Sequence, residues 1–562
     1  MRIVNACLVA FLSSRSSLAS AFGGAKLPSR AFTVRCGSTT MDATDVAPTA
    51  DAVKFDDVSE SYKELLGKLN TITQLNRCAS VLGYDQQVFM PKNGESAAER
   101  GQQMAALSGV VHNMKTDKAL LSLIEKAEAD LSAHGGSDFK DEARLLAMER
   151  KDFLKNERIP TELASRASAH QAKAQQSWQV ARASSDFSAF ESDLKECYAI
   201  AKEMAECKRD PDDDIYSTML DEFETSMPKA RIDELFGEIK ESLVPLITKV
   251  LDSENKPDKT CLTGAFPADK QAEIANKLVK AIGYDADFGR IDVSTHPFTS
   301  SSSTKDVRIT SRFTDGTWRE GIIATLHEGG HAIYEQNHPP SPYQIDSALS
   351  LGAHESQSLF WERHVSLSKA FWRYATPMMK ETFGEGFDYS PEEVYGAVNA
   401  VSPSFIRVEA DELTYPLHVI LRYQIEADII AGDLNVEDIP QRWNADMKRL
   451  LGVDVENDAD GCLQDMHWSA LAIGYFPTYL IGAATAAQLE HFCRKDFPNF
   501  DDLVEKGEFS PLREWLTEKV HKHGSRYESL DAMLEAELGE KLNPKYFIKY
   551  LTSKYSDLYG LD

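Results

Sequence analysis

The residues best suited to chemistry lie in the run His327-Glu328-Gly329-Gly330-His331. In a helix, a spacing of four places both imidazoles on one face, one turn apart, where they can bind a single metal ion. Glu328 lies beside them and is suited to hold a metal-activated water. The alternative is a solvated helix face with two unrelated histidines. Each glycine costs about 1 kcal/mol of helix propensity. We expect the two glycines to be kept despite this cost because they leave room on the helix surface for a substrate backbone to approach.

A catalytic zinc ion needs three protein ligands and one open position, so a third ligand must come from elsewhere in the chain. Glu355 stands 28 residues after His327, within a predicted helical run over 347–365. In gluzincins the third ligand is a glutamate on the helix after the H-E-x-x-H helix, and this separation resembles that arrangement. His354 competes by chemistry, although a place beside a ligand or facing the substrate is our preferred interpretation of it. Glu362 is a weaker competitor on the same face.

The elements that must position these residues are mainly helical. Between about residues 55 and 561, apolar residues recur with a helical period, and loop signals interrupt them at intervals. One segment differs, because residues 306–313 alternate between apolar and polar, which predicts a strand. A turn over 314–317 then leads into the helix that carries the H-E-x-x-H run. We predict a mainly α fold in a single large helical domain over 55–562.

The composition excludes two classes of protein. The chain has 562 residues, 88 acidic against 61 basic, a net charge of -27, a pI near 5.0 and a mean hydropathy of -0.36. An integral membrane protein is therefore excluded, and the longest uncharged run, 468–489, is predicted to be buried core. The negative field repels phosphate backbones, so nucleic acid is not an expected partner. The eight cysteines are predicted to be reduced and buried, with one disulfide pair as the alternative.

The first forty residues differ from the rest, because they carry a charge of +5 and leave -32 for the remainder. A basic start and a short apolar run precede Ala19-Ser20-Ala21-Phe22 and a Ser/Arg-rich stretch. This order resembles the bipartite plastid presequence of algae with secondary plastids, and predicts a removed presequence over 1–40 and a plastid location. A mitochondrial transit peptide is the rival, and a start at Met41 would give a cytoplasmic form. Residues 41–54 are predicted to be a disordered lead of acidic and small residues.

Six ordered motifs resemble the carboxypeptidase Taq family of zinc metallocarboxypeptidases, in the gluzincin clan, across nearly the whole mature chain. They are H-P-F at 296–298, D-x-R-x-T at 306–310, H-E-x-G-H at 327–331, H-E-S-x at 354–357, I-R-x-x-A-D at 406–411 and G-x-x-Q-D-x-H-W at 461–468. The upstream run 83–91 is also similar, although Tyr84 stands where a Trp is usual. No metal ligand and no catalytic glutamate departs from the pattern.

The resemblance implies a fold, a cofactor and an activity. The fold would be almost wholly helical, with a deep groove, a small sheet beside the zinc helix, and a homodimeric assembly. The cofactor would be one zinc ion per chain, or cobalt. The activity would be the removal of single C-terminal residues, proline excepted, from peptides with a free C-terminus and with broad specificity.

The resemblance also implies catalytic roles. Glu328 would act as general base and then general acid for a zinc-activated water. His467, Tyr475 and Tyr479 are candidates to stabilise the oxyanion, with aromatic core as the alternative for the two tyrosines. His296 is predicted to lie in the substrate groove, with a packed loop histidine as an equal alternative.

An exopeptidase must also bind a free carboxylate, and Arg407 is our candidate because a guanidinium binds a carboxylate through two bonds. The alternative for Arg407 is a buried pair with Asp411, four residues further along a helix. Arg308 and Arg312 are the other candidate anchors, and Arg308 has an alternative of its own, a salt bridge with Asp306.

Two other functions remain open at this point. A helical oligopeptidase that cuts within short peptides would use identical zinc chemistry and would lack only the carboxylate anchor. A catalytically silent scaffold with structural zinc belongs to a different class, and would be favoured if Glu328 or the open coordination position were missing.

Overall fold

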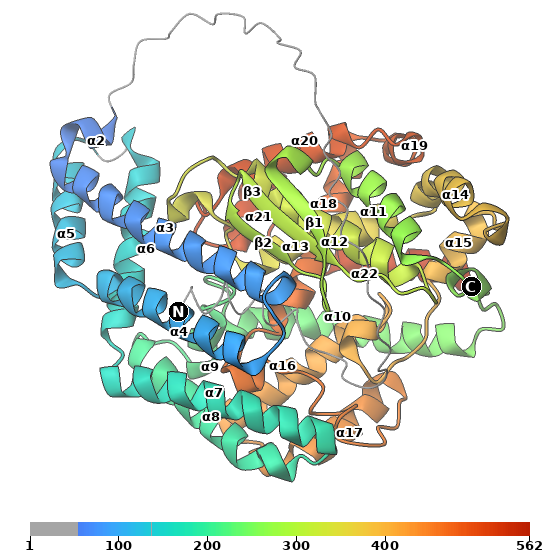
Figure 1. The fold of residues 1–562 in the computed structure, drawn as a ribbon, viewed down its shortest axis with the longest axis horizontal. Helices are drawn as coiled ribbons and strands as arrows, with labels where there is room; N and C mark the ends of the chain where they lie inside the picture. Colours follow the sequence, from blue (N-terminus) through green and yellow to red (C-terminus); the bar gives the residue numbers. More distant parts are fainter. Residues whose placement is uncertain (1–53, 136–137, 562) are drawn as a thin grey trace, which may run out of the picture.

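A computed structural model describes residues 54–135 and 138–561. The described chain is predominantly helical around one small sheet, which confirms the predicted mainly α class (Figure 1). The predicted presequence 1–40 and all but the last residue of the lead 41–54 lie outside the described residues. Among the described helices, none is long and apolar enough to cross a membrane.

The α-helices are α2 (Phe55–Val58), α3 (Glu60–Val88), α4 (Gly94–Lys115), α5 (Lys118–Ala133), α6 (Lys140–Glu157), α7 (Thr161–Ser184), α8 (Ser188–Lys208), α9 (Ile215–Leu220), α10 (Lys229–Asp252), α11 (Ala268–Ile282), α12 (Arg319–Asn337), α13 (Leu351–Leu359), α14 (Lys369–Phe383), α15 (Pro391–Val398), α16 (Tyr415–Ala431), α17 (Ile439–Leu451), α18 (Pro477–Asp496), α19 (Phe500–Lys506), α20 (Ser510–Lys519), α21 (Leu530–Leu538) and α22 (Lys545–Tyr559). The strands are β1 (Gly289–Val293), β2 (Thr299–Ser303) and β3 (Asp306–Ser311). Three short elements matter below: the π-helical turn η5 (Phe360–Ser366) and the 3-10 turns η7 (Arg407–Glu409) and η9 (Trp468–Ala470).

The predicted strand is β3, which forms the centre of a three-stranded sheet. It runs parallel to β1 and antiparallel to β2. Val307 and Ile309 are fully buried, as their alternation predicts. Thr310, on the predicted polar face, is also fully buried, because a loop covers this face. The Thr310 hydroxyl oxygen accepts the Phe298 backbone N–H of that loop at 2.9 Å, so it is not left without a partner. The central strand β3 is therefore buried, whereas β1 and β2 are partly exposed, and the sheet packs beside α12 (Figure 1).

Gly329 and Gly330, the two glycines of the H-E-G-G-H run on α12, serve close helix packing rather than the approach of a substrate, so that prediction was wrong. A Cβ at Gly329 would collide with Val279 on α11. A Cβ at Gly330 would lie 2.7 Å from the backbone oxygen of Gln357 on α13. The two glycines let α12 pack tightly between its neighbours.

Within the predicted helical run 347–365, the helix begins only at Leu351, so the predicted start was four residues early. The α-helix α13 continues directly into η5, and the winding changes at Phe360. The start of α13 is fixed by Glu224, whose Oε2 accepts the Gly352 N–H at 2.9 Å. A Cβ at Gly482 of α18 would lie 2.7 Å from Cβ of Glu355, so these two helices are also in close contact.

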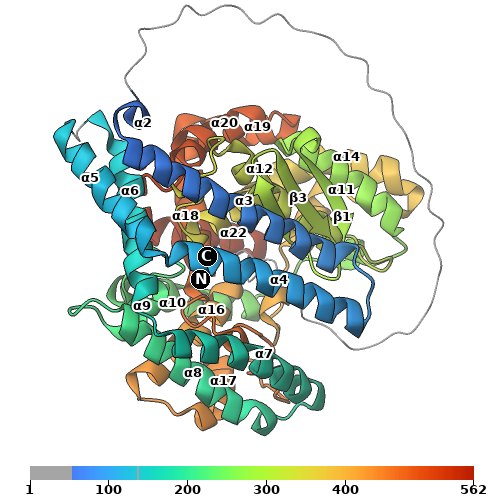
Figure 2. The same ribbon diagram turned by 60° about the vertical axis from the view of Figure 1, so that its left-hand side comes forward.

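The N-terminal helices have a core of their own. Apolar residues of α2, α3, α5 and α6 form a cluster separate from the large core of the body. Figure 2 shows α3 beside α4 and α5 beside α6, all on one side of the sheet-containing body. Within the single large domain that we predicted, the helices thus pack into more than one core.

The six described cysteines are all free, in line with the predicted reduced state. Four of them are buried as predicted. Cys78 is exposed on α3 and Cys207 is half-buried, so the prediction of burial was wrong for these two.

Candidate metal centre

His327 and His331 on α12 meet Glu355 on α13. One potential ligand atom from each residue lies within 4.8 Å of the others. Glu355 Oε2 is 3.3 Å from Nε2 of His331 and 3.9 Å from Nε2 of His327. This is the geometry of a three-ligand metal site, and the three side chains are 12 to 22% exposed, so a ligand can reach them.

Both histidines are oriented through their other ring nitrogen. His327 Nδ1 donates to Glu362 Oε2 (2.6 Å), and His331 Nδ1 donates to the backbone oxygen of His354 (3.1 Å). Because each Nδ1 carries the proton, each Nε2 presents a lone pair to the space beside Glu355. Glu362, a competitor for the third ligand position, instead accepts the Nδ1 hydrogen bond of the candidate ligand His327.

His354, the other competitor, also lies beside a ligand. Its ring stacks on His331 with centroids 4.3 Å apart, and its Nε2 lies 3.0 Å from Glu335 Oε1. It is outside the three-residue cluster, as we preferred from the sequence.

The electrostatics of the cluster are those of a cation site. Burial alone would lower the pKa of His327, but the bond to Glu362 and the nearby carboxylates raise it to about 9. Burial, with His354 beside it, lowers the pKa of His331 to about 4. Burial would raise the pKa of Glu355, but His331 and His327 lower it to about 2. Glu355 is therefore ionised, and negative charge accumulates around the two imidazoles.

Glu328 is 7% exposed, and burial raises the pKa of its carboxyl group. Its Oε2 accepts the hydroxyl proton of Thr299 on β2 at 2.6 Å. The same hydroxyl reaches the Glu328 backbone oxygen at 3.0 Å. A residue of β2 thereby holds the carboxylate of Glu328, which follows the candidate ligand His327 in the sequence.

The three candidate oxyanion residues form one aromatic cluster around the start of α18. The rings of Tyr475 and Tyr479 lie 5.4 Å apart. Burial raises the pKa of both hydroxyls, and Glu355 adds a smaller contribution in the same direction. His467 is 1% exposed, and its Nε2 lies 3.3 Å from the Tyr479 hydroxyl. His467 is thus linked to Tyr479.

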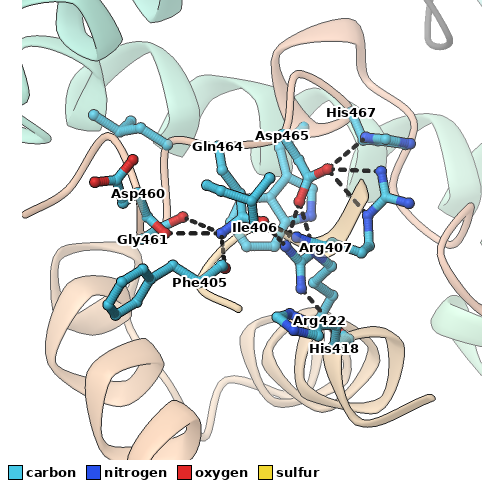
Figure 3. Close-up of polar contacts among 12 residues, drawn as sticks. Phe405, Ile406, Arg407, His418, Arg422, Asp460, Gly461, Gln464, Asp465 and His467 are labelled. Carbon is cyan, nitrogen blue, oxygen red and sulfur yellow. Dashed lines mark hydrogen bonds and ion pairs between the residues drawn. The ribbon is translucent and has the colours of Figure 1, made fainter. Parts of the chain in front are cut away.

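Arg407 is 5% exposed and belongs to a buried polar cluster (Figure 3). Its Nε and Nη2 donate to Asp465 Oδ1 at 3.2 and 2.9 Å. Asp465 Oδ2 accepts from Arg422 Nε at 2.6 Å. Two guanidinium groups share one carboxylate, and burial lowers the pKa of neighbouring His467 to about 3. The cluster therefore keeps one net positive charge.

The alternative pairing of Arg407 with Asp411 was wrong. Arg407 lies in the short turn η7, so no helix joins it to Asp411. Asp411 instead accepts backbone N–H groups of Ser402, Leu413 and Thr414. The remaining guanidinium nitrogen of Arg407, Nη1, has only a 3.5 Å contact with the Tyr415 hydroxyl.

The other candidate anchors are paired on or near the sheet. Arg308 binds both oxygens of Asp306 at 2.7 and 2.8 Å, the salt bridge that we gave as its alternative. Arg312 lies 3.1 Å from Glu320. His296 is buried in the loop between β1 and β2, where its backbone oxygen accepts the Ser294 hydroxyl.

Comparison with known proteins identifies this arrangement. The family model described as carboxypeptidase Taq (M32) metallopeptidase matches residues 64–555. The chain belongs to this family. It is 38% identical to Carboxypeptidase 1 of Bacillus subtilis over 508 residues, which cover 89% of this chain and 99% of that protein. It is 35% identical to Thermostable carboxypeptidase 1 of Thermus thermophilus, with the same coverage of both chains.

The fold agrees with solved structures of M32 carboxypeptidases. The crystal structure of the enzyme from Deinococcus radiodurans R1 superposes with a TM-score of 0.85 at 32% identity, covering 89% of this chain and all of that chain. Trypanosoma cruzi metallocarboxypeptidase 1 gives 0.83 at 34% identity, covering 88% and 99%.

Membership in the M32 family implies a divalent metal, and the residues present fit one. Two imidazole Nε2 atoms and one ionised carboxylate converge, a donor set that suits zinc and similar cations. Glu328 and Glu362 add negative charge beside the two histidines.

Three residues that contact the candidate site residues were not predicted from the sequence: Thr299, Glu335 and Asp465, the partner of Arg407. Asp465 lies within a motif that we had recognised, so its type was visible, but its partner lies 58 residues away. Thr299 directly follows the H-P-F motif, which offers a weak signal. Nothing in the spacing of Glu335 marks it as the partner of His354.

Proposed function

We propose that this chain is a metal-dependent carboxypeptidase that removes single residues from the free C-terminus of peptides, with broad specificity and with proline excepted. Membership in the M32 family supports metallocarboxypeptidase chemistry. The observation that carries the proposal is the convergence of His327, His331 and Glu355, with Glu328 fixed beside them.

His327, His331 and Glu355 would hold the metal, with zinc proposed and cobalt as the alternative. A divalent cation bound there supplies a Lewis acid that activates water and polarises the scissile carbonyl. The hydrogen bonds from the two Nδ1 atoms keep the rings in the orientation that this role requires.

Glu328 is the proposed proton acceptor. It is buried, has a raised pKa, and is held by Thr299, so it can take a proton from the attacking water and pass it to the leaving amine. A carboxylate in bulk water would have a lower pKa and no fixed direction, and would be a poorer base for this step.

Tyr475 and Tyr479 are the proposed donors to the developing oxyanion, because Glu355 influences both hydroxyls. Glu355 influences Tyr415 as well, but only Tyr475 and Tyr479 belong to the segment that the family resemblance marks for this role. His467, which is buried and linked to Tyr479, is proposed to orient that hydroxyl. His296 and His354 remain proposed substrate-groove residues.

Arg407 is the proposed anchor for the substrate carboxylate. Asp465 fixes its guanidinium from one side, and the cluster retains one net positive charge that a carboxylate can neutralise. Tyr479 lies under the guanidinium at 4.7 Å and is influenced by both Arg407 and Glu355, so it links the anchor to the metal cluster.

The proposals for the subcellular location and the oligomeric state rest on the sequence alone. A plastid presequence over residues 1–40 is proposed from its charge and its A-S-A-F order, with mitochondrial and cytoplasmic locations as the alternatives. A homodimer is proposed from the resemblance to the family.

The test is a digest of an unmodified ten-residue peptide by the metal-loaded enzyme, followed over time by mass spectrometry. The proposal expects a ladder of products that each lack one more C-terminal residue. Fragments that begin or end at internal bonds before the ladder forms would instead establish an oligopeptidase.

A further inference from the structure

A cavity of about 340 Å³ lies outside the metal centre between η5, α14, α18, α19 and α22. Exposed residues such as Lys369 and Asp502 line its outer part. Arg363 and His364, which are 6 and 2% exposed, line its buried part. The cavity thus leads from the surface to the η5 turn, whose Glu362 supports His327.

The buried part of this cavity presents unused hydrogen-bonding groups. Among the described residues, Nε and Nη1 of Arg363 and both ring nitrogens of His364 have no hydrogen-bond partner. A guanidinium group only donates, and a neutral imidazole offers one donor and one acceptor. The unmatched groups are therefore mostly donors, and buried donors of this kind are normally satisfied by an acceptor.

The charged groups that influence His364 are cations, and its ring lies against Tyr550 with centroids 4.3 Å apart. After burial, three cations account for the lowering of its pKa: Lys554, Arg363 and Arg494. A positive region in a chain of net charge -27 is unexpected. A group of cations around a buried side chain attracts an anion.

The acidic groups nearest to this region are already paired. Asp501 lies 2.9 Å from Arg494, and Glu490 is also bonded to that residue. Glu412 lies 2.6 Å from Lys554. These pairs leave His364 without a carboxylate partner of its own among the described residues.

Arg363 is closer to acids than His364 is, since Glu362 and Glu412 raise its pKa against the effect of burial. An anion would therefore lie nearer to His364, because the charged groups that lower its pKa are all cations. It would use Arg363 as a second donor.

We propose that this cavity binds one small monovalent inorganic anion, of the halide class, against His364 and Arg363. A larger or more highly charged anion would need more donors than these two side chains offer, and would approach the carboxylates of Glu490 and Asp501. Arg363 follows Glu362, the partner of His327, and is influenced by Glu355, so the site is tested by anion binding itself and not by activity, and its test does not depend on the proposed function.

Thermal unfolding of the metal-loaded enzyme, at constant ionic strength with gluconate replaced stepwise by bromide, tests the proposal. We expect a saturable rise in the melting temperature. Arg363→Gln and His364→Phe should each raise the half-saturating bromide concentration about tenfold or more, the effect of losing one charge-assisted or buried hydrogen bond. Arg373→Gln, which changes an exposed arginine at the same cavity, should leave the response intact.

Crystals soaked in bromide provide a readout that does not depend on how the variants fold. The proposal expects an anomalous peak beside the His364 ring in the wild-type enzyme. A melting temperature that ignores bromide, or density in the cavity without anomalous signal, would show that water fills it and would overturn the proposal. A rise with acetate but not with bromide would also overturn it, in favour of a carboxylate site.

Discussion

Replacement of Glu328 separates metal binding from proton transfer, because its carboxylate lies beside the ligands but is not one of the three. Glu328→Gln should keep one metal ion per chain and lower kcat by about 10²- to 10⁴-fold, the usual contribution of a general base. Thr299→Val keeps the carboxylate and removes the hydroxyl that bonds to its Oε2 at 2.6 Å and to the Glu328 backbone oxygen at 3.0 Å, and should cost less. Metal analysis and steady-state kinetics check both variants. Full activity in the metal-loaded Glu328→Gln enzyme would refute the assignment.

Glu362 should govern metal affinity without touching the metal. It accepts the Nδ1 proton of His327, and loss of such a partner lowers metal affinity about 10- to 100-fold. Glu362→Gln should show that loss in a competition assay with a chromogenic chelator. Glu335→Gln is the matched control, since its partner His354 is not a ligand. If both variants bind metal as the wild type does, the hydrogen bond has no such role.

At the residue scale, the sequence was most informative where chemistry requires a fixed local spacing. The pair His327 and His331 follows from helix geometry, and the position of Glu355 follows from its separation and the resemblance. The groups that orient these side chains could not be predicted in the same way. Glu362 was recognised only as a rival ligand, and Asp465 was not connected to Arg407, because tertiary packing alone brings these pairs together.

At the scale of elements, the glycines of α12 set how closely α13 approaches it. Gly330→Ala would place a methyl group 2.7 Å from the α13 backbone, and such overpacking costs about 1 to 3 kcal/mol. We expect that loss in the free energy of unfolding, together with weaker metal binding, because α13 carries Glu355. Gly67→Ala on α3 is the control: nothing lies within 4 Å of its added Cβ, and better helix propensity should stabilise the protein by about 0.5 to 1 kcal/mol. Equal effects in urea unfolding would contradict the packing explanation.

Some helices and strands could be predicted from the sequence, and others could not. The long helices and β3 follow from period and alternation. β1 alternates only over the four residues 290–293, which is too short a run to stand out, and β2 is Thr-Ser-Ser-Ser-Ser and has no apolar residue. Both strands pair with β3. The π-helical turn η5 depends on contacts around the metal centre and leaves no comparable signal in the sequence.

At the scale of the molecule, ion pairs join the N-terminal helices to the body. Asp221, just after α9, binds Lys151 and Lys155 of α6 at 3.0 and 2.5 Å. Burial alone would raise the pKa of Asp221, but the two lysines lower it to about 2. A depressed folded-state pKa contributes stability above the unfolded-state value, near 3.8, and that stability is lost as the pH falls towards 2.

Asp221→Asn should therefore lower the unfolding free energy by about 2 kcal/mol at pH 7, and the difference from the wild type should shrink between pH 4 and pH 2. Urea unfolding at pH 7, 4 and 3 measures it. Asp212→Asn, in the exposed loop before α9, is the control and should change little. A difference that does not vary with pH would mean that the ion pairs do not join the two parts as described.

The most direct test of the account compares one peptide with a free and with an amidated C-terminus, in the wild type and in Arg407→Gln. If the Arg407 guanidinium binds the terminal carboxylate, its loss should cost about 2 to 5 kcal/mol of transition-state binding. The value of kcat/KM for the free acid should then fall by about 30-fold to 5,000-fold. Cleavage of the amide, already poor, should barely change, and metal content should stay at the wild-type level. Equal losses on both peptides would contradict the account and leave Arg407 as a structural partner of Asp465.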